Sequence, residues 1–198
     1  MKKHAVVYAI AAAAIIGLSS NASAQAASDP KQGWDFLLTS GTVVPTGAQR
    51  DAVKRGSVSA AQLSYAINPM LSVMTTVGWT RSRDIASTGD PKLDVFTYDI
   101  GAEVHGRRMG AGKMLSFSPF AGLGAGGRSY NYRKLDVDAT HNLAGYASAG
   151  GEVGIGSRVS VRIEARDYVT GFKPLAGEGS ADARNDVAVL AGLRIKVR

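Results

Sequence analysis

Few side chains in this sequence are suited to acid–base, nucleophilic or metal chemistry. The 198 residues include no cysteine, which excludes disulfide scaffolds, thiolate metal sites and cysteine nucleophiles. Of the three histidines, His4 belongs to an apolar N-terminal segment, so only His105 and His141 remain for a site. The strand pattern described below separates these two, and a serine–histidine–acid triad needs partners within about 2.6 to 3.2 Å. We therefore predict no catalytic residue, no metal site and no cofactor.

A second group consists of charged residues at alternate positions. Arg162, Glu164 and Arg166 share one face of a strand, because alternate side chains of a strand point the same way. The full predicted set is Asp35, Asp99, Glu103, Glu152, Arg162, Glu164, Arg166 and Arg194. The set is either a proton relay or gate, or a structural plug of paired charges. We predict the plug, because removing one partner of a buried pair costs about 3 to 5 kcal/mol.

A glycine-rich motif, Gly122-x-Gly124-x-x-Gly127, has the spacing of a dinucleotide-binding loop. That motif works only where a strand ends and a helix begins. Here Arg128 to Tyr132 continue a strand pattern. We interpret the glycines as positions that make room for bulky neighbours.

The N-terminus predicts a secretory signal peptide over residues 1–24. Lys2 and Lys3 precede an apolar run that is shorter than a membrane-spanning helix, and a small-x-small site ends at Ala24. Cleavage between Ala24 and Gln25 would leave a polar lead, residues 25–32, and one domain, residues 33–198. The formal charge of +7 includes both lysines of the segment. Because we predict export, we predict no nucleic-acid partner despite the remaining positive charge.

Alternation of apolar and polar residues predicts strands from residue 33 to the end. In the last strand, Val187, Val189 and every second residue to Val197 form an apolar face. The eight predicted strands are Gly33–Val44, Ser57–Ile67, Leu71–Asp84, Val95–Arg107, Leu115–Arg133, Leu143–Ile155, Arg158–Phe172 and Asn185–Val197. An even number of strands closes as an up-and-down antiparallel meander.

The connections between these strands alternate in length. Residues 68–70 and 156–157 are tight turns, whereas 45–56, 85–94, 134–142 and 173–184 are longer and polar. Only residues 105–114 are long where a short turn is expected. Short turns at one end and long loops at the other are typical of outer-membrane barrels.

The identity of the polar face decides between a soluble and a membrane barrel. A soluble lipocalin-like barrel buries its apolar face, and a membrane barrel exposes it to lipid. The predicted charge set contains both signs and no lysine, which suits a narrow lumen better than a solvated surface. The apolar face carries aromatic residues at both strand ends, as two interfacial girdles require. These are Trp34, Phe36, Tyr65 and Phe117 at the short-turn end, and Trp79, Phe96 and Tyr98 at the long-loop end.

Two further groups are placed by the same alternation. Tyr130, Tyr132, Tyr168 and Phe172 share the parity of the charge set, so we expect them to line the long-loop mouth or to follow a bulge. Asp167 has the parity of the apolar face, so we place it at the outer rim, where a charge costs little.

The sequence resembles the OmpA/OmpX-like family of eight-stranded outer-membrane β-barrels. The resemblance covers the predicted domain and is carried by residues 118–126, similar to the family's glycine-rich fifth strand, and residues 162–168, similar to its seventh. It implies an all-β, eight-stranded antiparallel transmembrane barrel in a Gram-negative outer membrane, preceded by a cleaved signal peptide. The implied partners are outer-membrane lipid, lipopolysaccharide and, during biogenesis, the barrel assembly machinery.

The resemblance leaves the role of the protein open between several classes. We predict a non-enzymatic monomer with a structural or surface-interaction role and four short external loops. The alternative is a narrow pore for ions or small amphipathic solutes. Some barrels of this size modify lipid A, but the His-x-Ser arrangement of the deacylases is absent at His105 and His141. Basic loop residues close to the membrane are candidates for contact with lipopolysaccharide phosphates; the basic residues of the four loops include Lys54, Arg55, Lys92, Lys134, Lys173 and Arg184.

Overall fold

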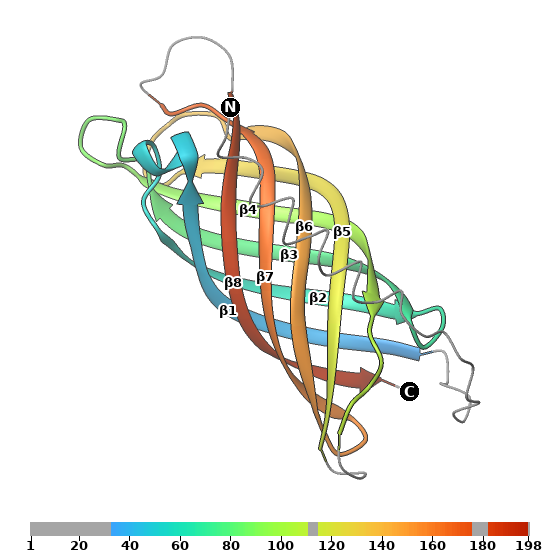
Figure 1. The fold of residues 1–198 in the computed structure, drawn as a ribbon. Helices are drawn as coiled ribbons and strands as arrows, with labels where there is room; N and C mark the ends of the chain where they lie inside the picture. The colour runs from blue at the N-terminus through green and yellow to red at the C-terminus, as the bar shows by residue number, and fades with distance from the viewer. Residues whose placement is uncertain (1–32, 111–114, 176–181, 198) are drawn as a thin grey trace.

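The computed structural model describes residues 33–110, 115–175 and 182–197. The predicted signal peptide, its cleavage position between Ala24 and Gln25, and the polar lead lie outside these ranges. Within them, eight antiparallel strands form one closed barrel in sequence order (Figure 1). The strands are β1 (Gly33–Thr46), β2 (Gly56–Ala66), β3 (Leu71–Arg83), β4 (Lys92–His105), β5 (Leu115–Tyr132), β6 (Thr140–Ile155), β7 (Val159–Phe172) and β8 (Asp182–Val197).

The barrel closes through a continuous ladder between β1 and β8. The pairs run from Trp34 opposite Val197 to Thr46 opposite Asn185. Each of these two strands therefore pairs with a neighbour on both sides, and the sheet has no open edge. The all-β, eight-stranded up-and-down fold is confirmed.

Apolar side chains point out of the barrel and charged side chains point into it. Ile100, Ile163 and Leu143 are 68%, 62% and 87% exposed, whereas Arg162 is 0% exposed. A water-soluble protein would not leave such a continuous apolar surface in contact with solvent. The lipocalin-like alternative, which needs the apolar set inside, is therefore wrong.

The connections follow the predicted alternation of lengths. At the short-turn end, the β2–β3 turn is held by Asn68, whose side-chain oxygen accepts hydrogen bonds from the Met70 and Leu71 amides at 2.8 and 2.9 Å. The β6–β7 turn places Gly156 at φ +72°, a left-handed conformation that glycine adopts without strain. The long β4–β5 connection lies at this same end, and its Met109 pairs with Phe117 of β5.

The long-loop end differs from the prediction in two ways. Strands β1, β4, β6 and β8 extend two or three residues beyond the predicted limits, because ladder pairing continues where hydrophobic alternation stops. Residues predicted as a loop after β1 include a short 3-10 helix, η1 (Gly47–Asp51), which packs against β1 and β8. In the described part of the chain, no helix is long and apolar enough to span a membrane.

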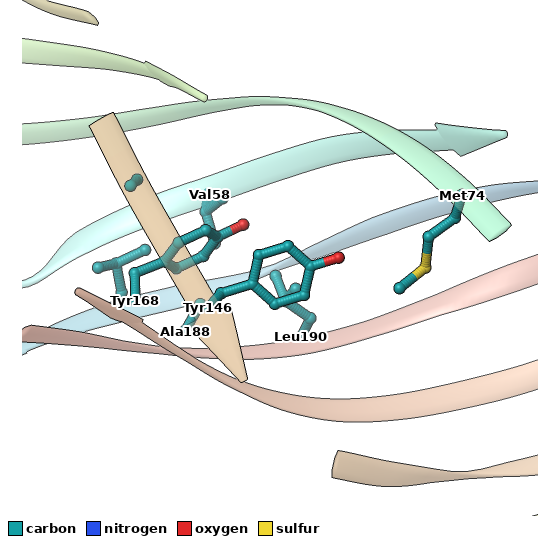
Figure 2. Packing of buried hydrophobic residues seen from close by; sticks show 8 residues of the cluster. Val58, Met74, Tyr146, Tyr168, Ala188 and Leu190 are labelled. Atoms are coloured by element: carbon teal, nitrogen blue, oxygen red, sulfur yellow. The ribbon is translucent and has the colours of Figure 1, made fainter. Parts of the chain in front are cut away.

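Part of the lumen is filled by an apolar and aromatic cluster. It contains Val43, Val58, Met74, Ala144, Tyr146, Tyr168, Ala188 and Leu190, and Figure 2 shows the two tyrosine rings lying next to each other among the aliphatic side chains. The ring centroids of the tyrosines are 5.5 Å apart. A β-carbon at Gly124 would overlap the Tyr146 ring and the Ile100 carbonyl. The glycine-rich strand β5 therefore gives the large rings of β6 their space.

Adding one methyl group should distinguish the two faces of this glycine-rich region. We predict that Gly124→Ala destabilises the barrel by about 1 to 3 kcal/mol, because the methyl group overpacks the Tyr146 site. Gly145→Ala is the matched control, since a β-carbon there would meet nothing closer than 3.8 Å. Urea unfolding in lipid vesicles measures both. Equal stability of the two variants would contradict the packing account.

Candidate functional site in the barrel lumen

The centre of the lumen is organised around Arg162 on β7. Its guanidinium donates from Nη1 and Nη2 to both carboxylate oxygens of Glu103, the first at 2.8 Å. Nε and Nη2 also donate to Oε2 of Glu164 at 3.1 and 3.0 Å. The guanidinium carbon lies 3.5 Å from the ring centroid of Phe120. Nη1 also lies 4.0 Å from Glu152, so this fully buried arginine is surrounded by three carboxylates and one aromatic face.

Towards the long-loop end the network continues through Arg166. Its Nε donates to Oε1 of Glu164 at 2.8 Å, and its Nη1 lies 3.6 Å from an oxygen of Asp99. Tyr168 joins the two, because its hydroxyl accepts a hydrogen bond from Arg166 and donates one to Asp99, each at 3.1 Å. Gln62 accepts a further bond from Arg166 at 3.3 Å. Glu164 therefore connects Arg162 and Arg166, which lie two residues before it and two residues after it on β7.

Towards the short-turn end the network continues through Arg194 on β8. Its Nη2 lies 3.2 Å from Glu103 and its Nη1 lies 3.1 Å from Glu152 and 4.0 Å from Asp35. Ser160 donates to Glu152 at 2.5 Å. The structure therefore places all eight residues of the predicted charge set in the lumen and joins them through one set of contacts.

One further lumen ion pair was not predicted as part of this set. Arg128 on β5 donates to Asp186 on β8, and both side chains are buried. The Arg128 guanidinium also lies 4.2 Å from the ring centroid of Tyr168. The alternation of the sequence does place both residues in the lumen, because Arg128 lies on the same face of its strand as Tyr130, and Asp186 lies on the same face as Arg194. Their pairing depends on strands far apart in the sequence and so could not be seen.

The long-loop end of the lumen is filled by a second cluster. It contains Ala52, Val53, Leu93, Val95, Tyr130, Tyr132 and Phe172, and the rings of Tyr130 and Phe172 are 4.8 Å apart. Three of the four aromatic residues expected at the mouth therefore lie in this cluster and fill the mouth. Tyr168 lies deeper, in contact with Asp99. The expectation that it lines the mouth is wrong.

Asp84 forms hydrogen bonds to several connections at the long-loop end, next to this cluster. Its side chain is fully buried and accepts hydrogen bonds from the Ala86 and Ser87 amides at 3.0 and 3.2 Å. It also accepts bonds from the Tyr132 hydroxyl at 2.7 Å and from the Leu175 amide at 2.9 Å. One carboxylate thus joins the β3–β4 loop, β5 and the segment after β7. Sequence reasoning missed this role, because a single aspartate at a strand end has no distinctive spacing.

The predicted girdle residues all lie on the outer face. At the short-turn end, the rings of Trp34 and Tyr65 are 5.0 Å apart. At the long-loop end, Trp79 and Phe96 stack with centroids 6.2 Å apart. Phe36, Tyr98 and Phe117 are 37%, 49% and 42% exposed. The two groups are separated along the strands, since β3 and β4 carry aliphatic residues between them.

A histidine, a serine and a carboxylate do meet near the short-turn end. Nε2 of His105 lies 3.1 Å from Glu103 and 3.4 Å from the Ser72 hydroxyl. A catalytic triad uses the two different ring nitrogens for the acid and the nucleophile. Here the same nitrogen faces both, so the contact does not relay a proton from serine to acid. Among the described residues, no group of three histidine, cysteine or acidic side chains is arranged to hold a metal.

One cavity in the lumen lies between Thr39, Gln62, Thr76 and Arg166 and has a volume of about 20 Å³. That volume holds about one water molecule.

The comparisons with known proteins agree with this architecture. The family model described as "Outer membrane protein beta-barrel domain" matches residues 10–194. No curated protein sequence matches the chain. Among solved structures, Neisserial surface protein A is similar with a TM-score of 0.55 and 15% identity, covering 83% of this chain and 97% of that one.

Two other solved structures show the range of proteins with similar shape. The N-terminal β-barrel domain of Pseudomonas aeruginosa OprF has a TM-score of 0.49 and 9% identity, covering 84% of this chain and 98% of that one. The outer membrane enzyme PagL has a TM-score of 0.45 and 14% identity, covering 82% of this chain and 99% of that one.

The fold, the outward apolar face and the family match define an integral β-barrel membrane protein. The chain belongs to the outer membrane protein beta-barrel domain family, and the protein is located in the outer membrane of a Gram-negative cell. In such barrels the short turns face the periplasm and the longer loops face outward. His105 therefore lies at the periplasmic end and Asp84 at the external end.

Breaking the central ion pair should be costly. We predict that Arg162→Gln lowers the free energy of unfolding by about 3 to 5 kcal/mol, because Glu103 and Glu164 would stay buried without their partner. Arg158→Gln is the matched control, since Arg158 is exposed in the β6–β7 turn. The double variant Glu103→Gln/Arg162→Gln should lose less than the sum of the single changes. Urea unfolding of the parent chain, of Glu103→Gln, of Arg162→Gln, of the double variant and of the control checks this, and an Arg162→Gln variant as stable as Arg158→Gln would disprove the pairing account.

Proposed function

We propose that this protein is a non-enzymatic barrel with a structural or surface-interaction role in the outer membrane. The observation that carries the proposal is the filled cross-section of the lumen, where Arg162 is fully buried between Glu103 and Glu164. A barrel with such an interior has only its lipid-facing wall and its external loops available for contact with other molecules. The four external connections are short, which favours a compact, stable surface over a large binding domain.

The pore alternative is less well supported than the structural role. An ion that crossed the lumen would have to pass the Arg162–Glu103 contact and then the cluster around Tyr130 and Phe172. Eight-stranded barrels have interiors just wide enough for their own side chains.

The enzyme alternative lacks a suitable group of residues in the part of the chain that the structure describes. The contacts of Ser72 and Glu103 with one nitrogen of His105 do not activate a nucleophile. His141 is exposed near the start of β6, on the opposite side of the membrane from His105. The remaining lumen carboxylates are engaged with arginines.

The proposed partners follow from the location. Lipid and lipopolysaccharide surround the outward apolar face, and the barrel assembly machinery would insert the chain. No aggregation-prone strand edge is left after β1 pairs with β8. We propose a monomer.

Two measurements on the full chain test the proposal. In planar lipid bilayers we predict no ion conductance above that of protein-free membranes. In cells with and without expression of the chain, we predict identical lipid A masses by mass spectrometry. Steady single-channel currents would establish the pore alternative, and a change in lipid A mass that depends on the protein would establish the enzyme alternative.

A further inference from the structure

A row of basic side chains crosses the outer face of the barrel at the level of the external rim. Arg83 on β3 stands directly opposite Lys92 on β4 in the ladder. On one side, the Lys54 amide donates to the Arg83 carbonyl, next to the bridge between Val53 and Asp84. On the other side, the Arg133 amide donates to the Lys92 carbonyl. We call Lys54, Arg83, Lys92 and Arg133 the cation row.

All four members of the row project on the lipid-facing side. Val53 and Asp84 are buried and point into the barrel. Their immediate neighbours Lys54 and Arg83 therefore point outward, and both are exposed. Lys92 is exposed and alternates with the buried Leu93. Arg133 donates to the carboxylate of Asp94, which has the outward parity of Lys92. With neighbouring strands about 4.8 Å apart, the row spans four chain segments over about 14 Å.

The row has too few anionic partners of its own. Asp94 is the only acid paired with it in the described part of the chain, and its carboxylate is taken by Arg133, with one bond at 3.0 Å. Those hydrogen bonds raise the pKa of Arg133 and keep it charged. Like charges that stand directly opposite in a ladder are destabilising. Lys54, Arg83 and Lys92 therefore form a repulsive arrangement that an external anion would relieve.

An aromatic platform lies immediately below the row on the same two strands. Trp79 and Phe96 stand opposite each other in the ladder and stack with nearly parallel rings. The Arg81 guanidinium lies 3.9 Å from the Trp79 ring centroid, between the platform and the row. Tryptophan and other aromatic residues mark the boundary between hydrocarbon and headgroups. The cation row therefore lies at the depth of the outer-leaflet headgroups.

We propose that the cation row and the platform of Trp79 and Phe96 form a binding site for one lipopolysaccharide molecule, with its phosphates on the row and its acyl chains below the platform. A free anion would use only the row, whereas the lipid A part of lipopolysaccharide uses the charges and the apolar wall together. The site gives the lipid partner of the proposed function a definite location. Because the site lies on the outside of the wall, its failure would leave the conductance and lipid A mass tests of the proposed function unaffected.

The protein supplies its own fluorescent reporter for this site. The sequence has two tryptophans, Trp34 and Trp79, so Trp34→Phe leaves only the tryptophan of the platform. The full chain with that change is placed in phosphatidylcholine nanodiscs and titrated with lipopolysaccharide, with dephosphorylated lipopolysaccharide and with inorganic phosphate. We expect a saturable change in Trp79 emission with intact lipopolysaccharide, weakened by added salt.

Removing three charges of the row should weaken this binding. In the same background, Lys54→Gln/Arg83→Gln/Lys92→Gln should raise the dissociation constant for lipopolysaccharide by about tenfold or more. Arg107→Gln/Arg108→Gln/Arg158→Gln removes three exposed charges at the periplasmic end and should leave binding unchanged. Without lipopolysaccharide, the row variant should be at least as heat-stable as the parent, because a like-charge repulsion is removed. That second measurement shows that any loss of binding is not a loss of folding.

Three results would overturn the proposal. Unchanged affinity of the row variant would exclude the row as the site. Equal binding of dephosphorylated lipopolysaccharide would exclude phosphate recognition. Saturation of the signal by inorganic phosphate at the same concentrations would assign the row to free anions and exclude the lipid.

Discussion

The buried guanidinium of Arg162 sets the central constraint on this barrel. A charge buried in a narrow, packed lumen must be paired and hydrogen-bonded, since its desolvation is not otherwise offset. Glu103 and Glu164 meet this requirement from β4 and β7. Strands on opposite sides of the barrel are therefore joined by ion pairs through its centre, and the register of the whole sheet must keep these partners at one level.

The wall adapts to this filled interior. Where β6 sends the Tyr146 ring inward, β5 presents Gly124 and leaves room for it. The outward side needs only apolar side chains between the two aromatic girdles, and a simple alternation of apolar and polar residues along each strand provides them. The two ends are finished differently: the external end is filled around Tyr130 and fastened by Asp84, whereas the periplasmic end contains the polar contact of His105 with Glu103.

Alternation and turn lengths were sufficient to predict the eight strands and their order from the sequence. The choice of the inward face rested on chemistry, because mixed charges such as Arg162 and Glu164 suit a lumen better than a solvated surface. Contacts between strands that are distant in the sequence could not be predicted. Arg128 with Asp186, the carboxylate of Asp84 and the alignment of Lys54, Arg83 and Lys92 become visible only once the ladder register is known. The 3-10 helix was missed because five residues carry too little periodicity.

The account makes the lumen a closed, packed interior, and single cysteines test this most directly because the chain has none of its own. Thr76 lines the small cavity and is 4% exposed, whereas Thr88 is exposed in the β3–β4 loop. Labelling of Thr76→Cys and Thr88→Cys with a membrane-impermeant thiol reagent in intact cells compares the two positions. A closed lumen predicts rapid labelling of Thr88→Cys and none of Thr76→Cys until the barrel is unfolded. Labelling of both at similar rates would contradict it.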